Sequence, residues 1–593
     1  MEDKKIIIVE DKTFPASKYQ EKIFDFIEKG CGNLVVNASA GSAKTTTIVN
    51  CMRFIPKGKK VLFVSFNKHI ATELTNRIGN DDAQARTCSS VGFEICRENG
   101  VALGEVDNEK YPNFIRNNIL SLTEFGETES LGRSRSTYMR NISQLVDLCR
   151  YTLCFTLTEI EHLASKYGIV PIRDEFAVCR KILEWGKENC NDIDQTDMVW
   201  LPSVLNLNTR KLLSDFIFID EAQDITMAQR SLILLCKKRG ARVIAVGDRN
   251  QQINIWCGSD EEAIDTFRKE PNTIELALPI CYRCGKNIIE KANEEITEKM
   301  LPAPGAADGQ VNYGVSISEI REGDMVLSRN TAPLISLQLA LLRMNRKVYI
   351  QGFKEIKEDI LRMINNTNST RIDRGCVLKD GLFTQLYEGL FEDIDKIASI
   401  PGMDEEETLS HPSVLYQYDN ICAIKALSEG LETVEQLVDK INIIFNDTSD
   451  KAVLLATVHR AKGLEADRVF IYKPSILINN RLATKDWEIK TEKNLRYVAY
   501  TRAKSSLNFL EEEKFYWKKN PYSAAREMID DLNSHRVLLR HPAPLYKPIT
   551  GKTEETIVSA PVITRQGMEI SSNKNGGGSK KAGGKFFKLI KND

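Results

Sequence analysis

The chain has 593 residues, of which 42% are apolar, so it is long enough for about four domains with packed cores. Lysine and arginine number 81 against 82 acidic residues, and the net charge of −1 excludes a protein that binds nucleic acid through bulk positive charge. Any nucleic-acid contact must therefore use local basic patches.

The N-terminus and the cysteine pattern indicate an intracellular protein. The first apolar run covers only residues 6–9, which is too short for a secretory signal, and no later run approaches the ~18 residues of a membrane span. The 14 cysteines form no evenly spaced framework, so we expect free thiols in a reducing compartment. The expected location is the cytoplasm or nucleoid, the nucleus, or the host cell of a virus, without membrane contact.

Short apolar runs that suit buried parallel strands recur along the chain. They lie at residues 33–36, 61–65, 215–219, 243–246, 325–327, 453–457 and 469–472. Most are followed by amphipathic helical stretches, and this alternation predicts stacked βαβ units. Two blocks of helical periodicity interrupt the pattern, and their clearest helices are at 141–153, 173–185, 358–365 and 433–445. The pattern predicts an α/β protein with two cores, each carrying a mainly helical insertion.

A small-residue loop follows the first of these strands. Residues 38–45 read Ala-Ser-Ala-Gly-Ser-Ala-Lys-Thr and are expected to open a helix at Thr46. A loop in that place points backbone N–H groups and the positive end of the helix dipole at an anion. Lys44 would then meet the β- and γ-phosphates of a nucleoside triphosphate, and Thr45 would ligate Mg²⁺.

Two glycines of the usual phosphate-binding pattern are replaced here, by Ala38 and Ala43, so this segment alone is equally compatible with a small-residue turn. A second segment decides between the two. The apolar strand at 215–219 ends in Asp220 and Glu221, at the strand end where open α/β sheets bind ligands. Asp220 would hold Mg²⁺, and Glu221 would orient and deprotonate the attacking water. The two segments together predict an NTPase.

With these residues, and with further motifs in matching order over about residues 20–504, the chain resembles the UvrD/Rep-type superfamily 1 DNA helicases. The loop at 38–42 has the form of that family, so only Ala43 departs from it. The resemblance implies two RecA-like P-loop NTPase cores with one ATP site in the cleft between them. It also implies 3′-to-5′ movement on single-stranded DNA and action at duplex junctions, coupled to strand separation.

On this resemblance, catalytic residues come from both cores. Gln251 of the first core would sense the γ-phosphate, while Arg283 and Arg502 would reach it from the second core. Arginines supplied in this way stabilise the charge that develops on the transferred phosphoryl group. The expected catalytic residues are Lys44, Glu221, Gln251, Arg283 and Arg502, and the expected Mg²⁺ ligands are Thr45 and Asp220.

The resemblance also assigns residues to the nucleotide and to the nucleic acid. Gln20 would read the adenine with Tyr282 beside it, and Glu465 would contact the ribose. The expected nucleotide-binding residues are Gln20, Ala40, Gly41, Ser42, Ala43, Lys44, Thr45, Thr46, Tyr282, Gly463 and Glu465. The residues expected at single-stranded DNA are Phe66, Asn67, Thr87, Trp256, Thr457 and His459. The rings of Phe66 and Trp256 would stack on bases.

The cysteines raise the question of a metal site. Cys281 and Cys284 form a CxxC pair, but no second pair or suitably spaced histidines follow nearby, so we assign this segment to the nucleotide motif around Arg283. An iron–sulfur cluster on the cysteines between 149 and 190 is the weaker alternative to buried free thiols.

The expected domain order follows from the two helical interruptions. Core 1A covers 1–105 and 206–275 around insertion 1B at 106–205, and core 2A covers 276–353 and 450–545 around a short 2B-like insertion at 354–449. A flexible basic tail is expected at 546–593. Its end at 585–591 is either a disordered basic segment or, through its paired Phe and its Leu-Ile, a hook for a protein partner or a contact with the DNA surface.

Two alternative functions stay open, and a third, a helicase–nuclease, is weakened because only about 90 residues follow residue 504 and they contain no recognised nuclease constellation. The first is an RNA-directed superfamily 1 helicase, because no residue in the sequence excludes the 2′-hydroxyl of RNA. The second is a nucleotide-gated DNA-binding accessory protein, or a translocase with little unwinding, in which Ala43 weakens the phosphate loop.

Overall fold

The structure is a computed structural model, and the chain divides into two units at residues 1–549 and 550–593. It describes residues 5–9, 12–65, 82–119, 129–171, 173–255, 258–259, 262–344, 346–376, 378–399, 404–444, 452–478, 486–511 and 523–539. None of the helices in these ranges is long and apolar enough to cross a membrane. The predicted partner-binding tail at 546–593 lies outside the described residues and stays a prediction.

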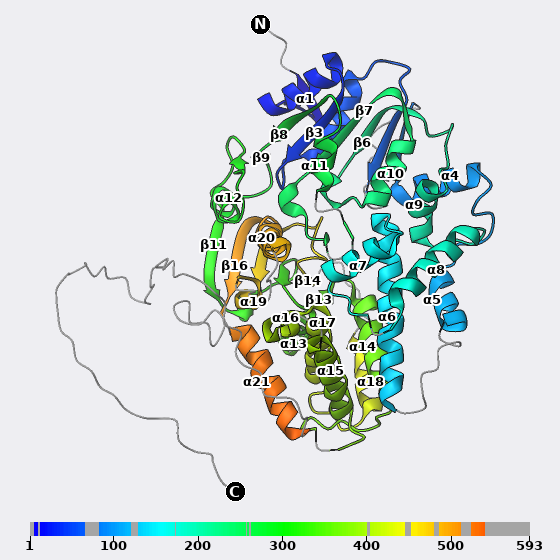
Figure 1. The fold of residues 1–593 in the computed structure, drawn as a ribbon. Coiled ribbons are helices and arrows are strands. Elements are labelled where there is room, and N and C mark those ends of the chain that lie inside the picture. The colour runs from blue at the N-terminus through cyan, green and yellow to red at the C-terminus, as the bar shows by residue number, and fades with distance from the viewer. Residues whose placement is uncertain are drawn as a thin grey trace, which may run out of the picture. The chain divides into compact units, whose positions relative to one another are not determined.

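The first part of the chain forms a parallel sheet whose described strands run in the order β5-β4-β6-β7-β3-β8. Its strands are β3 (Asn33–Ala38), β4 (Val61–Ser65), β5 (Ala83–Thr87), β6 (Ser214–Ile219), β7 (Lys237–Gly247) and β8 (Thr273–Leu278). Figure 1 shows β3, β6 and β7 close together, with α1, α10 and α11 beside them. The apolar runs of the central strands are buried, as expected for a parallel sheet covered on both faces.

Helices around this sheet follow the βαβ pattern. They are α1 (Lys18–Lys29), α2 (Lys44–Cys51), α4 (Cys88–Glu98), α10 (Met227–Leu235) and α11 (Ala263–Arg268). Between β5 and β6 the chain leaves the sheet through α5 (Lys110–Phe114), α6 (Glu129–Thr152), α7 (Leu157–Lys166), α8 (Glu175–Glu188) and α9 (Gln195–Val204). These five helices enclose a hydrophobic core of their own. An antiparallel hairpin of β1 (Ile6–Val9) and β2 (Lys12–Pro15) precedes α1.

The second part of the chain repeats the architecture. Its described strands run in the order β11-β16-β15-β12-β14-β13, and their pairings are parallel. They are β11 (Gln310–Val315), β12 (Met325–Ser328), β13 (Val348–Ile350), β14 (Val453–Thr457), β15 (Ala466–Ile471) and β16 (Ala503–Leu510). A short parallel pair, β9 (Ile280–Cys281) with β10 (Leu301–Pro302), lies between the two sheets in the sequence.

Helices again surround and interrupt this second sheet. Those next to its strands in sequence are α12 (Lys286–Asn293), α13 (Thr331–Arg343), α19 (Pro474–Ile478), α20 (Asp486–Tyr500) and α21 (Ser523–Leu538). The excursion between β13 and β14 contains α14 (Phe353–Asn365), α15 (Leu382–Ala398), α16 (Glu405–Ser410), α17 (Pro412–Leu427) and α18 (Val434–Ile444). Their buried apolar side chains join those of α13 and the sheet in one core.

The predicted fold class, an α/β protein with two parallel sheets and helical excursions, is confirmed. One local expectation was wrong. The helix after the first strand was expected to open at Thr46, but α2 begins at Lys44. The reason is that Ala43 adopts a left-handed conformation, with φ 60° and ψ 42°, and turns the chain directly into the helix.

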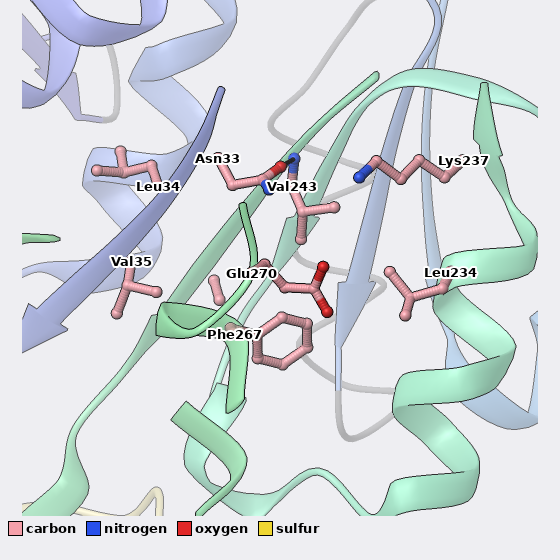
Figure 2. Close-up of a pocket in the computed structure, with 9 residues that line it drawn as sticks. Asn33, Leu34, Val35, Leu234, Lys237, Val243, Phe267 and Glu270 are labelled. Atoms are coloured by element: carbon pink, nitrogen blue, oxygen red, sulfur yellow. Dashed lines mark hydrogen bonds between the residues drawn. The ribbon is translucent and has the colours of Figure 1, made fainter. Parts of the chain in front are cut away.

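A cavity near the amino ends of β3 and β7 is lined by side chains that include Asn33, Val243, Phe267 and Glu270 (Figure 2). Its volume is about 10 Å³, which is room for about one water molecule. The loop that follows Ala38 lies at the other end of β3, so this cavity is not part of the predicted nucleotide site.

The crossing of α4 and α9 yields a first prediction. Gly92 of α4 lies so close to α9 that an added Cβ would collide with the carbonyl oxygen of Met198, a backbone atom that cannot rotate away. Gly92→Ala is therefore expected to lower the unfolding free energy by about 1–3 kcal/mol, measured by urea titration. The control is Gly389→Ala in α15, where an added Cβ meets nothing within 4 Å. Equal stability of the two variants would contradict the close helix crossing.

Candidate functional site

The loop between β3 and α2 lies against the segment that follows β9. Gly41 adopts φ 67°, and a Cβ there would come within 2.7 Å of Arg283 Cβ and 2.9 Å of Cys281 Sγ. The backbone N–H of Tyr282 donates to the Gly41 carbonyl at 2.8 Å. Only glycine fits at this point, because both the backbone conformation and the close approach exclude a side chain.

The same loop contains an orphaned polar atom. The Ser42 hydroxyl is buried and finds no hydrogen-bond partner among the described residues. A buried polar group without a partner costs free energy, so such an atom marks a place for a ligand oxygen or a water. The N-terminus of α2 adds backbone N–H groups and the positive end of its dipole. The loop therefore fits an anion such as a phosphate.

Two carboxylates at the end of β6 face the start of α2. Lys44 Nζ lies 3.1 Å from Glu221 Oε2, and the Thr45 hydroxyl donates to Asp220 Oδ2 at 3.0 Å. Because β3 and β6 both run parallel to β7, their carboxyl ends meet at the same edge of the sheet. The fold thus brings Lys44 and Thr45 next to Asp220 and Glu221, although the two pairs are about 175 residues apart in sequence.

Burial and mutual charge control the ionisation of this cluster. Burial raises the pKa of Asp220, and the negative charge of Glu221 raises it further. Burial also acts to raise the pKa of Glu221, but the positive charges of Lys44 and Lys462 outweigh it and lower that pKa. Burial acts to lower the pKa of Lys44, yet the surrounding carboxylates raise it overall. Glu221 is therefore a carboxylate, and Lys44 a cation, at neutral pH.

The chain's own oxygen atoms fit a magnesium ion that also binds phosphate. Thr45 and Asp220 supply two oxygen atoms, and the described residues contain no group of three or more His, Cys, Asp or Glu side chains that could hold a metal. Mg²⁺ is usually bound by one or two carboxylates together with substrate phosphates and water. The same finding gives no support to a zinc or iron–sulfur site, and all cysteines in the described ranges are free.

Side chains of the second sheet's segments reach this edge of the first sheet. Arg502 Nη2 lies 3.5 Å from Gln251 Oε1, and Lys462 Nζ donates to the backbone carbonyl of Gln251 at 2.7 Å. Lys462 also forms an ion pair with Asp224. Burial lowers the pKa of Arg502 to about 10, with the charge of Arg283 adding to the effect, so Arg502 stays charged at neutral pH.

A tyrosine of α20 completes these contacts. The Tyr497 side chain is fully buried, and its hydroxyl accepts a hydrogen bond from the backbone N–H of Ala40 at 2.9 Å. The same hydroxyl donates to Asp248 Oδ2 at 3.0 Å. One phenol therefore joins α20 to the phosphate loop and to the turn after β7.

Four further residues predicted at the nucleotide, Arg283, Glu465, Tyr282 and Gly463, lie on the segments that follow β9 and β14. Arg283 Nε forms an ion pair with Glu465 Oε2 at 2.6 Å, and Lys504 Nζ lies 2.9 Å from Glu465 Oε1. The ring of Tyr282 is half exposed. Gly463 has φ 88°, a left-handed conformation that favours glycine.

Two predicted contact residues already have partners within the fold. Gln20 is buried in a capping box with Ser17 at the start of α1, and its Nε2 donates to the Thr47 hydroxyl at 3.0 Å. Thr87 caps α4 by accepting from the N–H of Ser90 at 3.2 Å. Their side chains thus stabilise helix ends, and their contacts with the nucleotide and the nucleic acid stay predictions.

The predicted nucleic-acid residues are only partly described. Thr457 ends β14, and His459 follows it. Burial lowers the pKa of His459 to about 3, with help from the positive charge of Arg329, so its imidazole is neutral at pH 7. The other predicted contacts, Phe66, Asn67 and Trp256, lie outside the described residues.

Sequence reasoning missed three residues of the site. Lys462, Tyr497 and Asp248 all lie inside motifs that were recognised, but they received no role. Tyr497 stands out as a polar group in a largely buried segment, and this is a usable signal, whereas Lys462 lies among half-buried and exposed residues and gives no such signal. Their partners could not be named from the sequence, because Tyr497 and Asp248 are separated by 249 positions.

Comparison with known families decides the identity of this arrangement. Residues 19–272 match the UvrD/REP helicase N-terminal domain, and residues 329–513 match the UvrD-like helicase C-terminal domain. The chain belongs to the UvrD/REP helicase family. As a member of this family, it is an ATP-hydrolysing helicase, and the predicted resemblance is confirmed.

Individual relatives of this UvrD/REP-family chain are distant but similar over most of its length. The ATP-dependent DNA helicase PcrA of Bacillus subtilis (strain 168) is 24% identical over 80% of each chain. PcrA of Staphylococcus aureus (strain Mu50) is 23% identical with the same coverage. A probable DNA helicase II homolog of Mycoplasma pneumoniae is 25% identical over 81% of this chain and 82% of its own.

The left-handed Ala43 yields a prediction. A non-glycine residue in this region costs about 1–2 kcal/mol, so Ala43→Gly is expected to raise the unfolding free energy by about 1 kcal/mol and to retain ATP hydrolysis. The control is Ala102→Gly, since Ala102 has φ 58° but lies in the helical excursion of the first sheet. Urea titration and phosphate release measure the two effects. A loss of hydrolysis in Ala43→Gly alone would contradict this account of the loop.

Proposed function

We propose that this helicase acts on DNA, moves 3′ to 5′ along a single strand and hydrolyses Mg²⁺-bound ATP between its two α/β cores. The observation that carries the proposal is the reach of Arg502 to Gln251 and of Tyr497 to Ala40 and Asp248. These contacts place groups of the second core beside the phosphate loop of the first. The DNA-helicase names of the relatives support DNA as the substrate.

The chain's own residues would divide the chemistry of the ATP site. Lys44, the Ser42 hydroxyl and the N-terminus of α2 would hold the phosphates, and Thr45 with Asp220 would hold Mg²⁺. The metal would supply positive charge against the phosphate oxygens. Glu221, which is a carboxylate at neutral pH, would orient the attacking water and accept its proton once Lys44 binds phosphate.

The ion pair between Lys44 and Glu221 gives the site a resting arrangement. Lys44 Nζ lies 3.1 Å from Glu221 Oε2, so the proposed base, Glu221, is paired with the lysine that would bind phosphate. Phosphate oxygens would draw Lys44 away, and Glu221 would then be free to accept a proton from water. Arg502 would stabilise the charge that develops on the transferred group.

Nucleic-acid contacts divided between the cores would turn closure into movement. Thr87 ends β5 of the first sheet, whereas Thr457 ends β14 of the second and His459 follows it. Each closing and opening of the cores would change the spacing of these contacts along a bound strand. The neutral imidazole of His459 would contribute a hydrogen bond, not a charge, to a phosphate or base.

The first test of the proposed function is ATP turnover with and without single-stranded DNA. We expect stimulation by poly(dT), and a loss of roughly 10²-fold or more in kcat for Lys44→Ala, because a buried phosphate-binding charge is removed. The control is Lys211→Ala, since Lys211 is a largely exposed partner of Glu94. Equal stimulation of ATP turnover by poly(U) would support an RNA-directed enzyme.

ATP turnover that no nucleic acid stimulates in the wild type, but that poly(dT) stimulates in Ala43→Gly, would support the accessory-protein alternative.

Strand separation on tailed duplexes tests the direction. Unwinding of a duplex with a 3′ single-stranded tail, but not of one with a 5′ tail, is expected for a 3′-to-5′ motor. Lys44→Ala serves as the control for ATP dependence. The opposite preference would contradict the proposed direction while leaving the ATP site unaffected.

A further inference from the structure

We propose that Tyr497 is a positioning residue for ATP hydrolysis: its hydroxyl fixes Gln251 opposite Arg502 and ties this arrangement to the phosphate loop. The inference rests on the proposed function, because it concerns the same ATP site. It assigns a role to a residue whose partners are all buried and lie far from it in sequence.

The position of the Tyr497 hydroxyl is the first argument. It accepts from the N–H of Ala40 at 2.9 Å and donates to Asp248 Oδ2 at 3.0 Å. Ala40 follows β3 and Asp248 follows β7, and these two strands are paired in the first sheet. A single hydroxyl of α20 is therefore seated between two neighbouring loops of the other core, and it uses both its donor and its acceptor.

Asp248 carries the connection onward. Its Oδ2 also accepts from Gln251 Nε2 at 2.8 Å, and its Oδ1 accepts from the N–H of Asn250 at 3.0 Å. The two polar atoms of an amide point in different directions, so holding the nitrogen of Gln251 fixes the direction of its oxygen. That oxygen lies 3.5 Å from Arg502 Nη2. The hydrogen bonds thus run without a break from Ala40 through Tyr497, Asp248 and Gln251 to Arg502.

The chemistry of the phenol suits this task. Burial raises the pKa of Tyr497 well above its usual value, and the charge of Asp248 raises it further, so the hydroxyl stays protonated. Phenylalanine would fill the same volume but would leave the Ala40 N–H and Asp248 Oδ2 without this partner. Arg502 is held by its own core through the carbonyl oxygens of Val498 and Leu464. Loss of the Tyr497 hydroxyl would therefore loosen the placement of Gln251 opposite Arg502, while the side chains of Lys44 and Thr45 keep their partners Glu221 and Asp220.

A second tyrosine on the same helix offers a matched control. Tyr500 is also buried, with 1% of its surface exposed, and its ring packs edge-on against Phe509 of β16 with centroids 5.6 Å apart. Tyr500→Phe removes a hydroxyl from the same helix at a similar burial. The ring of Tyr500 contacts Phe509 of its own sheet, and no hydrogen bond among the described residues joins its hydroxyl to Ala40 or Asp248.

The experiment compares Tyr497→Phe, Tyr500→Phe and wild type in the full chain. Three quantities are measured: kcat at saturating ATP and poly(dT), the Kd of a fluorescent ATP analogue, and the midpoint of thermal unfolding. Misplaced catalytic groups cost up to about 10²-fold in rate. We expect kcat of Tyr497→Phe to fall by about 10- to 100-fold with the Kd nearly unchanged, and Tyr500→Phe to behave as wild type.

Asp248→Asn provides the second variant. The Tyr497 hydroxyl and Gln251 Nε2 both donate to Asp248 Oδ2, and the asparagine would replace one carboxylate oxygen with an NH₂ group that cannot accept. It is expected to show the same split, with kcat lowered and the Kd retained. The proposal is overturned if Tyr497→Phe keeps the wild-type kcat, if both tyrosine variants lose kcat equally, or if the loss lies in the Kd. If Tyr497→Phe is unfolded, Asp248→Asn decides by the same criteria. A wild type without DNA-stimulated hydrolysis would instead overturn the proposed function itself.

Discussion

Charged side chains are buried at the carboxyl edge of the first sheet and need partners. The contact between the two cores depends on which residues supply these partners. Lys44 forms an ion pair with Glu221, and the Thr45 hydroxyl donates to Asp220. The carboxylates of Asp224 and Asp248 are also buried at this edge of the sheet. Burying a charge without a partner costs several kcal/mol. Lys462 pairs with Asp224 and Tyr497 donates to Asp248, and both come from the second core. The edge of one core is therefore completed by groups of the other.

This dependence links the chemistry to the movement of the cores. On the proposed function, groups that meet only when the cores are together would act in hydrolysis only in that state, and closure would be a condition for catalysis. Since Arg502 and Tyr497 both belong to the segment around α20, the arginine and the hydroxyl would arrive together. The same closure would shorten the distance between nucleic-acid contacts on the two cores. On the proposed function, a site shared between the two cores would both hydrolyse ATP and displace the cores along the strand.

The sequence predicted the fold class and much of the site for identifiable reasons. Buried parallel strands are continuous apolar runs, and the predicted strands at 61–65 and 453–457 coincide with β4 and β14. Lys44, Asp220 and Glu221 could be placed at one sheet edge because parallel strands align their carboxyl ends. The helix start at Lys44 was missed because nothing in the sequence showed that Ala43 adopts a left-handed conformation. The partners of Lys462 and Tyr497 were missed because contacts over more than 200 positions follow from the packing of two cores and leave no local pattern.

The most direct measurement of the central claim is single-turnover ATP hydrolysis by Arg502→Ala, with the Kd for ATP determined in parallel. If the second core completes the site, ATP still binds through the phosphate loop, but hydrolysis falls by roughly 10³-fold. A rate within about tenfold of wild type, which is only about 1.4 kcal/mol of transition-state stabilisation, would show that the first core hydrolyses ATP without the second and would contradict the account.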